Sequence, residues 1–493
     1  MDNKKPNILL IFTDQQRADT IHALGNPVIK TPNLDKLVKS GVSFTNAYSP
    51  SPVCVPARCS MHYGQYPSNT GCYDNGYEMP RDKESFMHAL GRAGYRTHGI
   101  GKCHFTPDPH ALRGFQSREI QEEIVKEPGR DDYLKFLRQS GFSHITDPHG
   151  VRSEMYYIPQ PAQMPAEYHP TQWVGDRGVQ FINKESRGSQ PWFLFLSFVH
   201  PHPPFAVPAP WHKLYRAPLM PLPNVPQDVE SLHTYINRIQ NRYKYRDQGI
   251  DNNLLRCIKA YYYAAISFID YQVGRILEVL EKTGEMDNTL ILFTSDHGEH
   301  LGDYNCFGKR SMHDTCARVP LIIKFPNQIS GNQVCDEPVT LVDIAPTVLS
   351  AANAGITTHE LDGMDIAELA AGSGRRKYVF SQYQREERAI YMIVRKRWKY
   401  FYSAPDDREF LFDREVDPLE RRNRAGVRFL AGIKQEMKEQ LIKFLRECGE
   451  EGGIEKDDWK KYPAISVPDD PDVGLLVQDN VWAEEIIPGY SEE

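Results

Sequence analysis

Cysteine is sparse in this sequence and never falls at a metal-binding spacing. Nine cysteines are scattered through 493 residues without a Cys-x-x-Cys pair. That absence argues against a zinc ribbon and against a thioredoxin-type redox site. An odd count without regular spacing also argues against a secreted disulfide framework. We therefore expect reduced thiols that mostly serve as small core residues, with Cys54 as the exception.

The sequence also lacks a hydrophobic run long enough to cross a membrane. The apolar run at residues 7–13 is too short for a spanning helix, and no small-residue cleavage site follows it. We expect this run to be a buried strand. The expectation is a cytoplasmic protein with no membrane partner, or a periplasmic one whose signal peptide has been removed.

An excess of positive charge is missing as well. The chain has 58 Lys and Arg against 65 Asp and Glu, which gives a net charge of −7. This balance disfavours a nucleic-acid partner. If the substrate is an anion, any positive field has to be local to the site.

Four predicted strands each end in polar residues. They cover residues 7–13, 95–101, 192–199 and 289–294, and the polar residues after them are Asp14-Gln15, Lys102 to His104, His200 to His202, and Asp296-His297. Open α/β sheets place their chemistry just past the carboxyl ends of parallel strands. We therefore expect one composite site built from four strand ends.

The remaining pattern of residues 1–373 predicts one large α/β domain. Helices are predicted at 33–40, 171–183 and 255–283, and further strands at 42–47 and 319–325. Residues 49–58 form a Pro-rich turn that leads into a helix. Residues 106–170 are expected to run over the surface, where such segments often line sites. The fold class is α/β, a large mixed and mostly parallel sheet flanked by helices.

A smaller C-terminal subdomain is predicted for residues 374–450. It follows a linker at 372–377 and combines short antiparallel strands at 389–394, 398–402 and 410–413 with an amphipathic helix at 429–446. This is an α+β subdomain. The tail, residues 451–493, is acidic and Pro-rich. Its Trp459, Trp482 and Tyr490 are candidate anchors onto the body or onto a partner subunit, so a homo-oligomer through the tail is one expectation.

The segment Cys54-Val55-Pro56-Ala57-Arg58 resembles the modification motif of the sulfatases, Cys-x-Pro-x-Arg. The pentapeptide alone is a weak signal. Further matches follow in the family's order: residues 101–104 (Gly-Lys-x-His), 200–202, 294–303, 307–309, 319–323, 398–400 and 411–418. Taken together, the chain resembles the formylglycine-dependent sulfatases of the alkaline phosphatase superfamily. The tail after about residue 450 is not covered.

The resemblance implies that Cys54 is oxidised to formylglycine, whose hydrate is the nucleophile. A geminal diol can take a sulfuryl group on one oxygen, and its other hydroxyl then expels sulfate. A simple serine sulfate would have no such exit. The implied partners are a formylglycine-generating or anaerobic sulfatase-maturating enzyme and a small anionic sulfate-ester substrate.

The resemblance also implies one divalent metal. Asp14, Asp296 and His297 would hold it, with residue 54 contributing an oxygen. Gln15 would be a ligand or lie just behind one, and it stands where many members have Asp. His297 stands where Asn is often found. Hard cations prefer oxygen ligands, so calcium is expected, with magnesium or manganese as alternatives.

The anion-binding residues are also implied by the resemblance. Arg58 would fix the hydrated aldehyde through charge-assisted hydrogen bonds. Lys102 and Lys309 would bind the sulfate oxygens and offset negative charge in the transition state.

The same resemblance divides acid and base between two histidines. His202 would protonate the departing alcohol oxygen, and His104 would take the proton from the second hydroxyl when sulfate leaves. Of the pair His200 and His202, His200 is the weaker candidate for a catalytic role. Asn75 is a weaker candidate near the metal or substrate, and a turn asparagine is the alternative.

Two other functions stay open. A phosphonate monoester hydrolase or phosphodiesterase of the same superfamily can share the formylglycine motif, although it generally lacks the Lys102-x-His104 pair. A non-catalytic homologue that binds a sulfated ligand is the second. The substrate can be a carbohydrate, aryl or small alkyl sulfate. Residues 102–107 and the tail are loosely similar to choline sulfatases.

Overall fold

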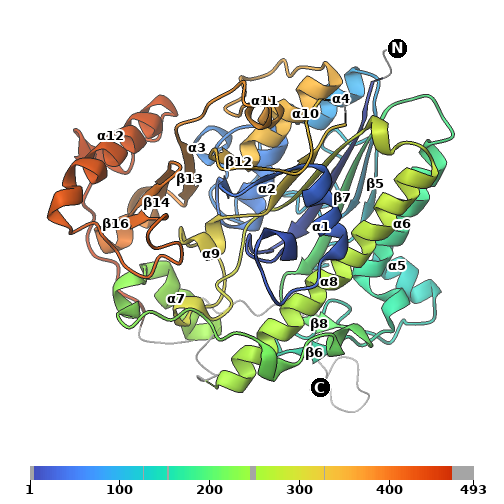
Figure 1. Cartoon of the computed structure of the whole chain (residues 1–493), viewed down its shortest axis with the longest axis horizontal. Coiled ribbons are helices and arrows are strands. Elements are labelled where there is room, and N and C mark those ends of the chain that lie inside the picture. Colours follow the sequence, from blue (N-terminus) through green and yellow to red (C-terminus); the bar gives the residue numbers. More distant parts are fainter. Residues whose placement is uncertain (1–4, 126, 153–154, 245–250, 327, 469–493) are drawn as a thin grey trace, which may run out of the picture.

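An eight-stranded sheet forms the centre of the larger part of the molecule (Figure 1). The structure is a computed structural model that describes residues 5–125, 127–152, 155–244, 251–326 and 328–468. The strand order is β11-β2-β10-β9-β1-β7-β4-β5. The strands are β1 (Asn7–Asp14), β2 (Val42–Phe44), β4 (Arg96–Gly101), β5 (Ser117–Ile120), β7 (Trp192–Pro201), β9 (Thr289–Ser295), β10 (Leu321–Lys324) and β11 (Gln333–Cys335).

The central strands of this sheet are parallel. β1 pairs in parallel with β7 and with β9, and β4 pairs in parallel with β7 and with β5. β10 is antiparallel to both of its neighbours. All residues of β1, β7 and β9 are buried, as expected for parallel strands covered on both faces.

Helices cover both faces of the sheet (Figure 1). One face packs against α1 (Pro32–Ser40), α6 (Pro170–Glu185) and α8 (Asn252–Lys282), and the other against α2 (Cys54–Tyr63), α4 (Phe86–Arg92) and α10 (Ile344–Ala352). Within β1, Leu9 and Ile11 face the first layer, whereas Leu10 and Phe12 face the second. The alternation follows from the two-residue repeat of a strand.

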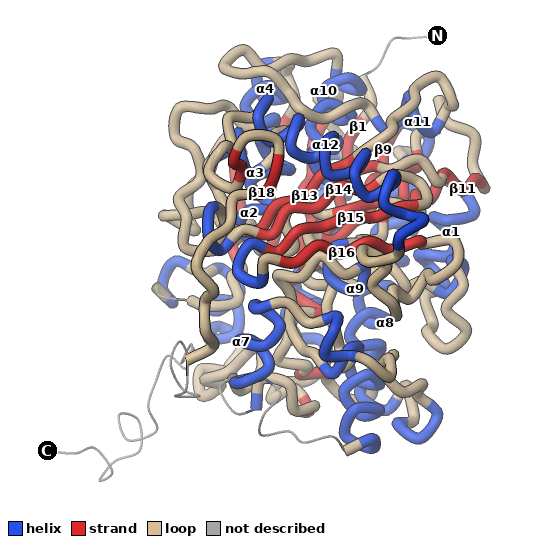
Figure 2. The backbone as a smooth tube through the Cα atoms, turned by 90° about the vertical axis from the view of Figure 1, so that its left-hand side faces the viewer, coloured by secondary structure: helices blue, strands red, loops and turns tan. Residues whose placement is uncertain are grey.

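A second, antiparallel sheet lies in the C-terminal part (Figure 2). Its strands are β13 (Val379–Tyr383), β14 (Ile390–Val394), β15 (Trp398–Ser403) and β16 (Arg408–Asp413). The helix α12 (Ala431–Glu447) packs on one face, and the other face packs on residues of the larger part, including Met312 and Ala317. Trp459 stacks on Tyr402 with ring centroids 4.6 Å apart, so the beginning of the tail lies on this sheet.

The predicted fold class is confirmed, and some elements differ from their predicted form. The predicted strand at 42–47 divides into β2 and β3 (Ala47–Tyr48), which pair with different strands. β13 was not predicted. The segment 106–170 contains β5 and the helix α5 (Asp132–Gln139). The domain boundaries stay predictions, and Trp482 and Tyr490 lie outside the described residues.

No helix in the described part of the chain is both long enough and apolar enough to cross a membrane.

Candidate active site

The carboxyl ends of four neighbouring strands carry the candidate residues. Asp14 ends β1, Lys102 follows β4, His202 follows β7 and Asp296 follows β9. Because the strand order is β9-β1-β7-β4, these four ends lie side by side. The side chains of all four residues are buried.

Cys54 lies at the middle of this group, at the first residue of α2. Its Sγ lies 2.8 Å from Lys309 Nζ, 3.3 Å from His297 Nε2 and 3.7 Å from Asp14 Oδ1. The side chains of His104 and His202 also interact electrostatically with the thiol. Burial raises the pKa of Cys54, but the charges of Lys309, Lys102 and His297 outweigh it and hold this pKa well below its ordinary value.

Asp14, Cys54, Asp296 and His297 could hold a metal ion. One ligand atom from each lies within 4.8 Å of the others, and all four side chains are buried. His297 Nδ1 lies 2.9 Å from the carbonyl oxygen of Gly298, which directs Nε2 toward the cluster. Burial and the charge of Asp14 raise the pKa of Asp296. A divalent cation would relieve this repulsion, so the donor set fits such an ion.

Arg58 forms ion pairs with the carboxylates of both Asp14 and Asp296. Its Nε lies 3.0 Å from Asp296 Oδ2 and its Nη2 3.1 Å from Asp14 Oδ2. Its Nη1 donates to the carbonyl oxygen of Lys102 at 2.7 Å. The contact with the hydrated aldehyde stays a prediction, whereas the contact with both carboxylates is what the structure contains.

Gln15 is engaged by two charged side chains. Lys309 Nζ donates to Gln15 Oε1 at 2.9 Å, and Gln15 Nε2 donates to Glu299. The amide therefore ties Lys309 to the strand end that carries Asp14. The backbone N–H of Gln15 donates to Asp296 Oδ1 at 3.0 Å, which links the two strand ends.

The histidines occupy different places. His202 Nδ1 lies 2.5 Å from the carbonyl oxygen of Pro203, so Nε2 faces the site. Burial lowers the pKa of His202 to about 4, although Glu123 raises it. His104 is partly buried, and its backbone has a φ of 54°. His200 instead contacts Thr171 Oγ1 at 3.3 Å, away from the thiol.

Asn75 supports the start of α2. Its Oδ1 accepts the backbone N–H of Val55 at 3.0 Å. The N-cap residue of this helix is Val53, whose side chain makes no capping hydrogen bond. Asn75 therefore takes the place of the capping residue.

Sequence reasoning missed three side chains that contact the candidate residues. Glu123 forms an ion pair with Lys102, and Tyr156 OH lies 3.5 Å from His202 Nε2. Both come from the segment 106–170, which has no periodic pattern to single them out. Glu299 accepts from Gln15 and from Tyr157 OH. The sequence did offer one indication of Glu299, because this residue lies within the segment 294–303 that matches the family.

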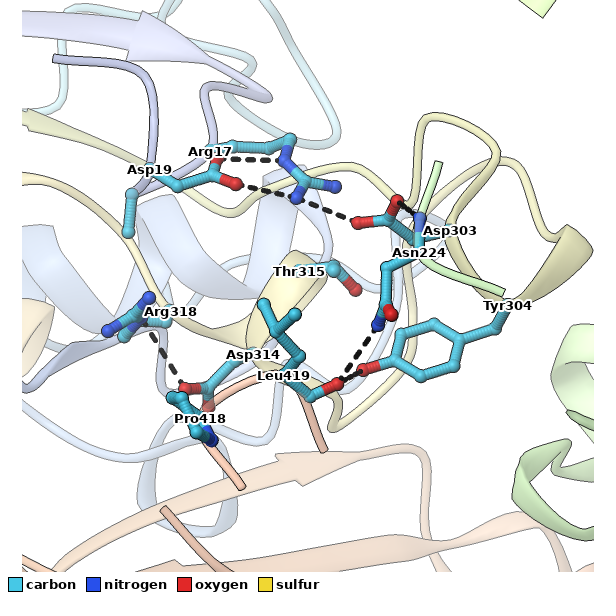
Figure 3. A pocket seen from close by; sticks show the side chains of 11 residues that line it. Arg17, Asp19, Asn224, Asp303, Tyr304, Asp314, Thr315, Arg318, Pro418 and Leu419 are labelled. Carbon is cyan, nitrogen blue, oxygen red and sulfur yellow. Dashed lines mark hydrogen bonds and ion pairs between the residues drawn. The ribbon is translucent and has the colours of Figure 1, made fainter. Parts of the chain in front are cut away.

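The loop after β9 is supported by Arg17 (Figure 3). Arg17 Nη1 donates to the carbonyl oxygens of Glu299 and His300 at 3.0 Å each, and Nη2 lies 2.8 Å from Asp303 Oδ2. A cavity of about 40 Å³ lies beside this contact. The four candidate metal ligands do not line this cavity, so it is separate from the candidate site.

Comparison with known proteins gives a consistent result. The family model described as Sulfatase matches residues 6–354, and the model described as N-sulphoglucosamine sulphohydrolase, C-terminal, matches residues 302–447. The chain is 32% identical to an arylsulfatase of Clostridium perfringens, over 85% of this chain and 90% of the relative. It is also 32% identical to a choline-sulfatase of Rhizobium meliloti, over 86% of this chain and 83% of the relative.

Among solved structures, a phosphonate monoester hydrolase of Agrobacterium radiobacter is similar, with a TM-score of 0.80 and 26% identity. The match covers 90% of this chain and 96% of the other. The two curated sulfatases and the span of the family model together decide the family. The chain belongs to the sulfatase family, within the alkaline phosphatase superfamily, and is a sulfatase enzyme.

Proposed function

We propose that this enzyme hydrolyses a sulfate monoester with formylglycine at position 54 and one divalent metal. The observation that carries the proposal is the position of Cys54 at the start of α2, beside Asp14, His297 and Lys309. The substrate class is a small anionic sulfate ester, of a carbohydrate, an aryl alcohol or a small alkyl alcohol.

The metal would be held by Asp14, Asp296 and His297 together with residue 54. Two carboxylates and a sulfate oxygen suit calcium, and the imidazole of His297 leaves magnesium or manganese as alternatives. When bound, the metal supplies Lewis-acid polarisation of the sulfate, and formylglycine supplies in its hydrated form a hydroxyl nucleophile.

The chain's own residues then bind the anion and move protons. Lys309 Nζ lies 2.8 Å from the Sγ of residue 54, and Lys102 Nζ lies 2.5 Å from Asp14 Oδ2. These two ammonium groups would bind the sulfate oxygens. His202 would act in its imidazolium form, which the charge of Glu123 stabilises, and would donate the proton of Nε2 to the departing alcohol oxygen. His104, in contact with residue 54, would accept a proton there.

A second candidate function is the hydrolysis of phosphonate monoesters. The solved hydrolase with a TM-score of 0.80 favours it. The Lys102-x-His104 pair favours the sulfatase, because the phosphonate class generally lacks it. Sulfate esters are therefore the first choice, and the two classes are separated by direct comparison of substrates.

The decisive experiment combines the mass of the peptide that contains residue 54 with turnover of two substrates. Protein from a host with a maturation enzyme should carry an aldehyde at position 54. It should hydrolyse nitrophenyl sulfate faster than a matched nitrophenyl phosphonate monoester. Cys54→Ala should be inactive, whereas Cys59→Ala, a change at a buried thiol on the same helix, should stay active. An active protein with only unmodified cysteine at position 54 would refute the proposal.

The proposal requires the maturation enzyme as a partner, and burial dictates when it acts. Cys54 is 1% exposed in the folded chain. Its thiol is therefore accessible to another enzyme only before the larger part of the chain has folded.

A further inference from the structure

Glu123 connects two candidate catalytic side chains through one carboxylate. The group forms an ion pair with Lys102 Nζ, and its Oε1 lies 3.5 Å from His202 Nε2. The Glu123 side chain is 8% exposed. Burial raises its pKa, but His202, Lys102 and Arg152 outweigh burial and hold this pKa well below its ordinary value. Glu123 is therefore an anion.

The backbone around Glu123 is fixed on both sides. The N–H of Glu122 donates to Asp131 Oδ2 at 3.0 Å. Arg152 Nη2 donates to the carbonyl oxygen of Glu123 at 3.3 Å and lies 3.6 Å from its Oε1. The carboxylate is thus held from behind by Arg152 and points at Lys102 and His202.

His202 depends on this carboxylate more than Lys102 does. Lys102 keeps a second anionic partner, since Asp14 Oδ2 lies 2.5 Å from its Nζ. The His202 ring is held at Nδ1 by Pro203, and its Nε2 faces Glu123 and the hydroxyl of Tyr156. Removal of the Glu123 carboxylate therefore takes the ion-pair partner from the reacting nitrogen and leaves it the hydroxyl of Tyr156.

We propose that Glu123 is a positioning residue for departure of the alcohol, because its carboxylate fixes His202 Nε2 relative to the Lys102 ammonium. The inference rests on the proposed function. Lys102 binds an oxygen of the sulfate, and the departing oxygen is bonded to the same sulfur. The separation of Lys102 and His202 therefore sets whether Nε2 reaches the departing oxygen. A misplacement of about 1 Å can lower a rate by ~10²-fold.

The test compares two leaving groups in Glu123→Gln. A nitrophenolate leaves without a proton, whereas an alkoxide needs one. We expect kcat on an alkyl sulfate to fall roughly 10- to 100-fold, and kcat on nitrophenyl sulfate to change little. KM should change little on both substrates, because Lys102 keeps its ion pair with Asp14 and therefore stays in place to bind the sulfate. In a His202→Ala background, Glu123→Gln should cause no further loss on the alkyl sulfate.

The matched control is Glu119→Gln, which removes a carboxylate that pairs with His98 and Arg177, outside the site. It should leave both rates unchanged. If Glu123→Gln yields too little folded protein, Glu123→Asp, which keeps the charge but shortens the reach, should give the same selective loss. Equal losses on both substrates, no loss, or a loss that adds to that of His202→Ala would overturn the inference.

Failure of the proposed function gives a different result. Wild-type protein that hydrolyses neither sulfate would reject that function. The same variants are then compared on nitrophenyl and alkyl phosphonate monoesters, where the selective loss in Glu123→Gln is again the expected result and an equal loss the contrary one.

Discussion

Asp14 and Asp296 bring two carboxylates together in a buried site. Arg58 contacts both, yet burial and the charge of Asp14 still raise the pKa of Asp296. A group whose pKa is raised by folding destabilises the fold while it is ionised. Without metal, the Asp296 charge therefore opposes folding at neutral pH, and a bound cation should reverse this effect.

Asp296→Asn should separate these two effects. The change removes one negative charge with little change in shape, so we expect the metal-free variant to unfold at a higher temperature than metal-free wild type. Added calcium should raise the unfolding temperature of wild type and have little effect on the variant. Thermal unfolding with chelator and with calcium measures both.

Asp287→Asn, at an exposed carboxylate, is the matched control and should behave like wild type in both conditions. The prediction is contradicted if Asp296→Asn still gains stability from calcium, or if its metal-free form is less stable than wild type.

Residues at strand ends could be predicted from the sequence, because the end of a buried apolar run is visible in it. Asp14, Lys102 and Asp296 are of this kind. Glu123 is different, since its importance comes from two partners brought to it by folding. Nothing in the residues next to Glu123 indicates those partners.

At the scale of elements, α2 determines where residue 54 lies. The helix begins at Cys54, and Asn75 accepts the N–H of Val55 at its first turn. A missing cap costs about 1 kcal/mol in typical helices. Here the same contact also fixes the first turn against the site.

Asn75→Ala should therefore lower both stability and kcat. We expect a loss of about 1 kcal/mol in the free energy of unfolding and a fall in kcat of roughly tenfold through displacement of residue 54. Denaturant unfolding and turnover of nitrophenyl sulfate measure the two effects. Asn75→Asp keeps the acceptor oxygen and should retain most of both. Equal activity in wild type and Asn75→Ala would show that α2 does not need this cap.

Elements with strong patterns could be predicted, and weak ones could not. β1, β7 and β9 each contain a nearly continuous apolar run, and α8 keeps one apolar face over its length. The antiparallel direction of β10 depends on its neighbours in the sheet, which the sequence does not state. β5 is only partly buried, so it lacks the apolar signal of a central strand.

At the scale of the whole molecule, a buried group of charges joins the C-terminal sheet to the segment between β9 and β10. Lys399 of β15 is 0% exposed, and its Nζ lies 2.8 Å from Asp314 Oδ1 and 2.8 Å from the carbonyl oxygen of Met312. It also pairs with Glu420, whose carboxylate accepts the N–H of Asp314 at 2.8 Å. Asp314 begins α9 (Asp314–Ala317), five residues after Lys309. The C-terminal sheet is therefore tied to the segment that carries a candidate catalytic lysine.

Lys399→Met should be strongly destabilising, because it leaves two carboxylates buried without their shared cation. Loss of one partner of a buried ion pair typically costs about 3–5 kcal/mol. Burial raises the pKa of Asp314, but Lys399, Arg414 and Arg318 outweigh it and hold this pKa well below its ordinary value. The stabilisation from this charge is therefore complete above the ordinary pKa of about 4 and is lost as the pH falls below it.

The difference in stability between wild type and Lys399→Met should accordingly be large at pH 7 and should decrease below about pH 4, where these carboxylates begin to take up protons in the unfolded chain. Denaturant unfolding at a series of pH values measures it. Lys396→Met is the matched control, because Lys396 is exposed and pairs with the exposed Asp336, and such pairs contribute little. A difference that stays constant from pH 7 to pH 3 would mean that Lys399 acts through packing of its aliphatic chain. The charge link between the C-terminal sheet and α9 would then contribute nothing to stability.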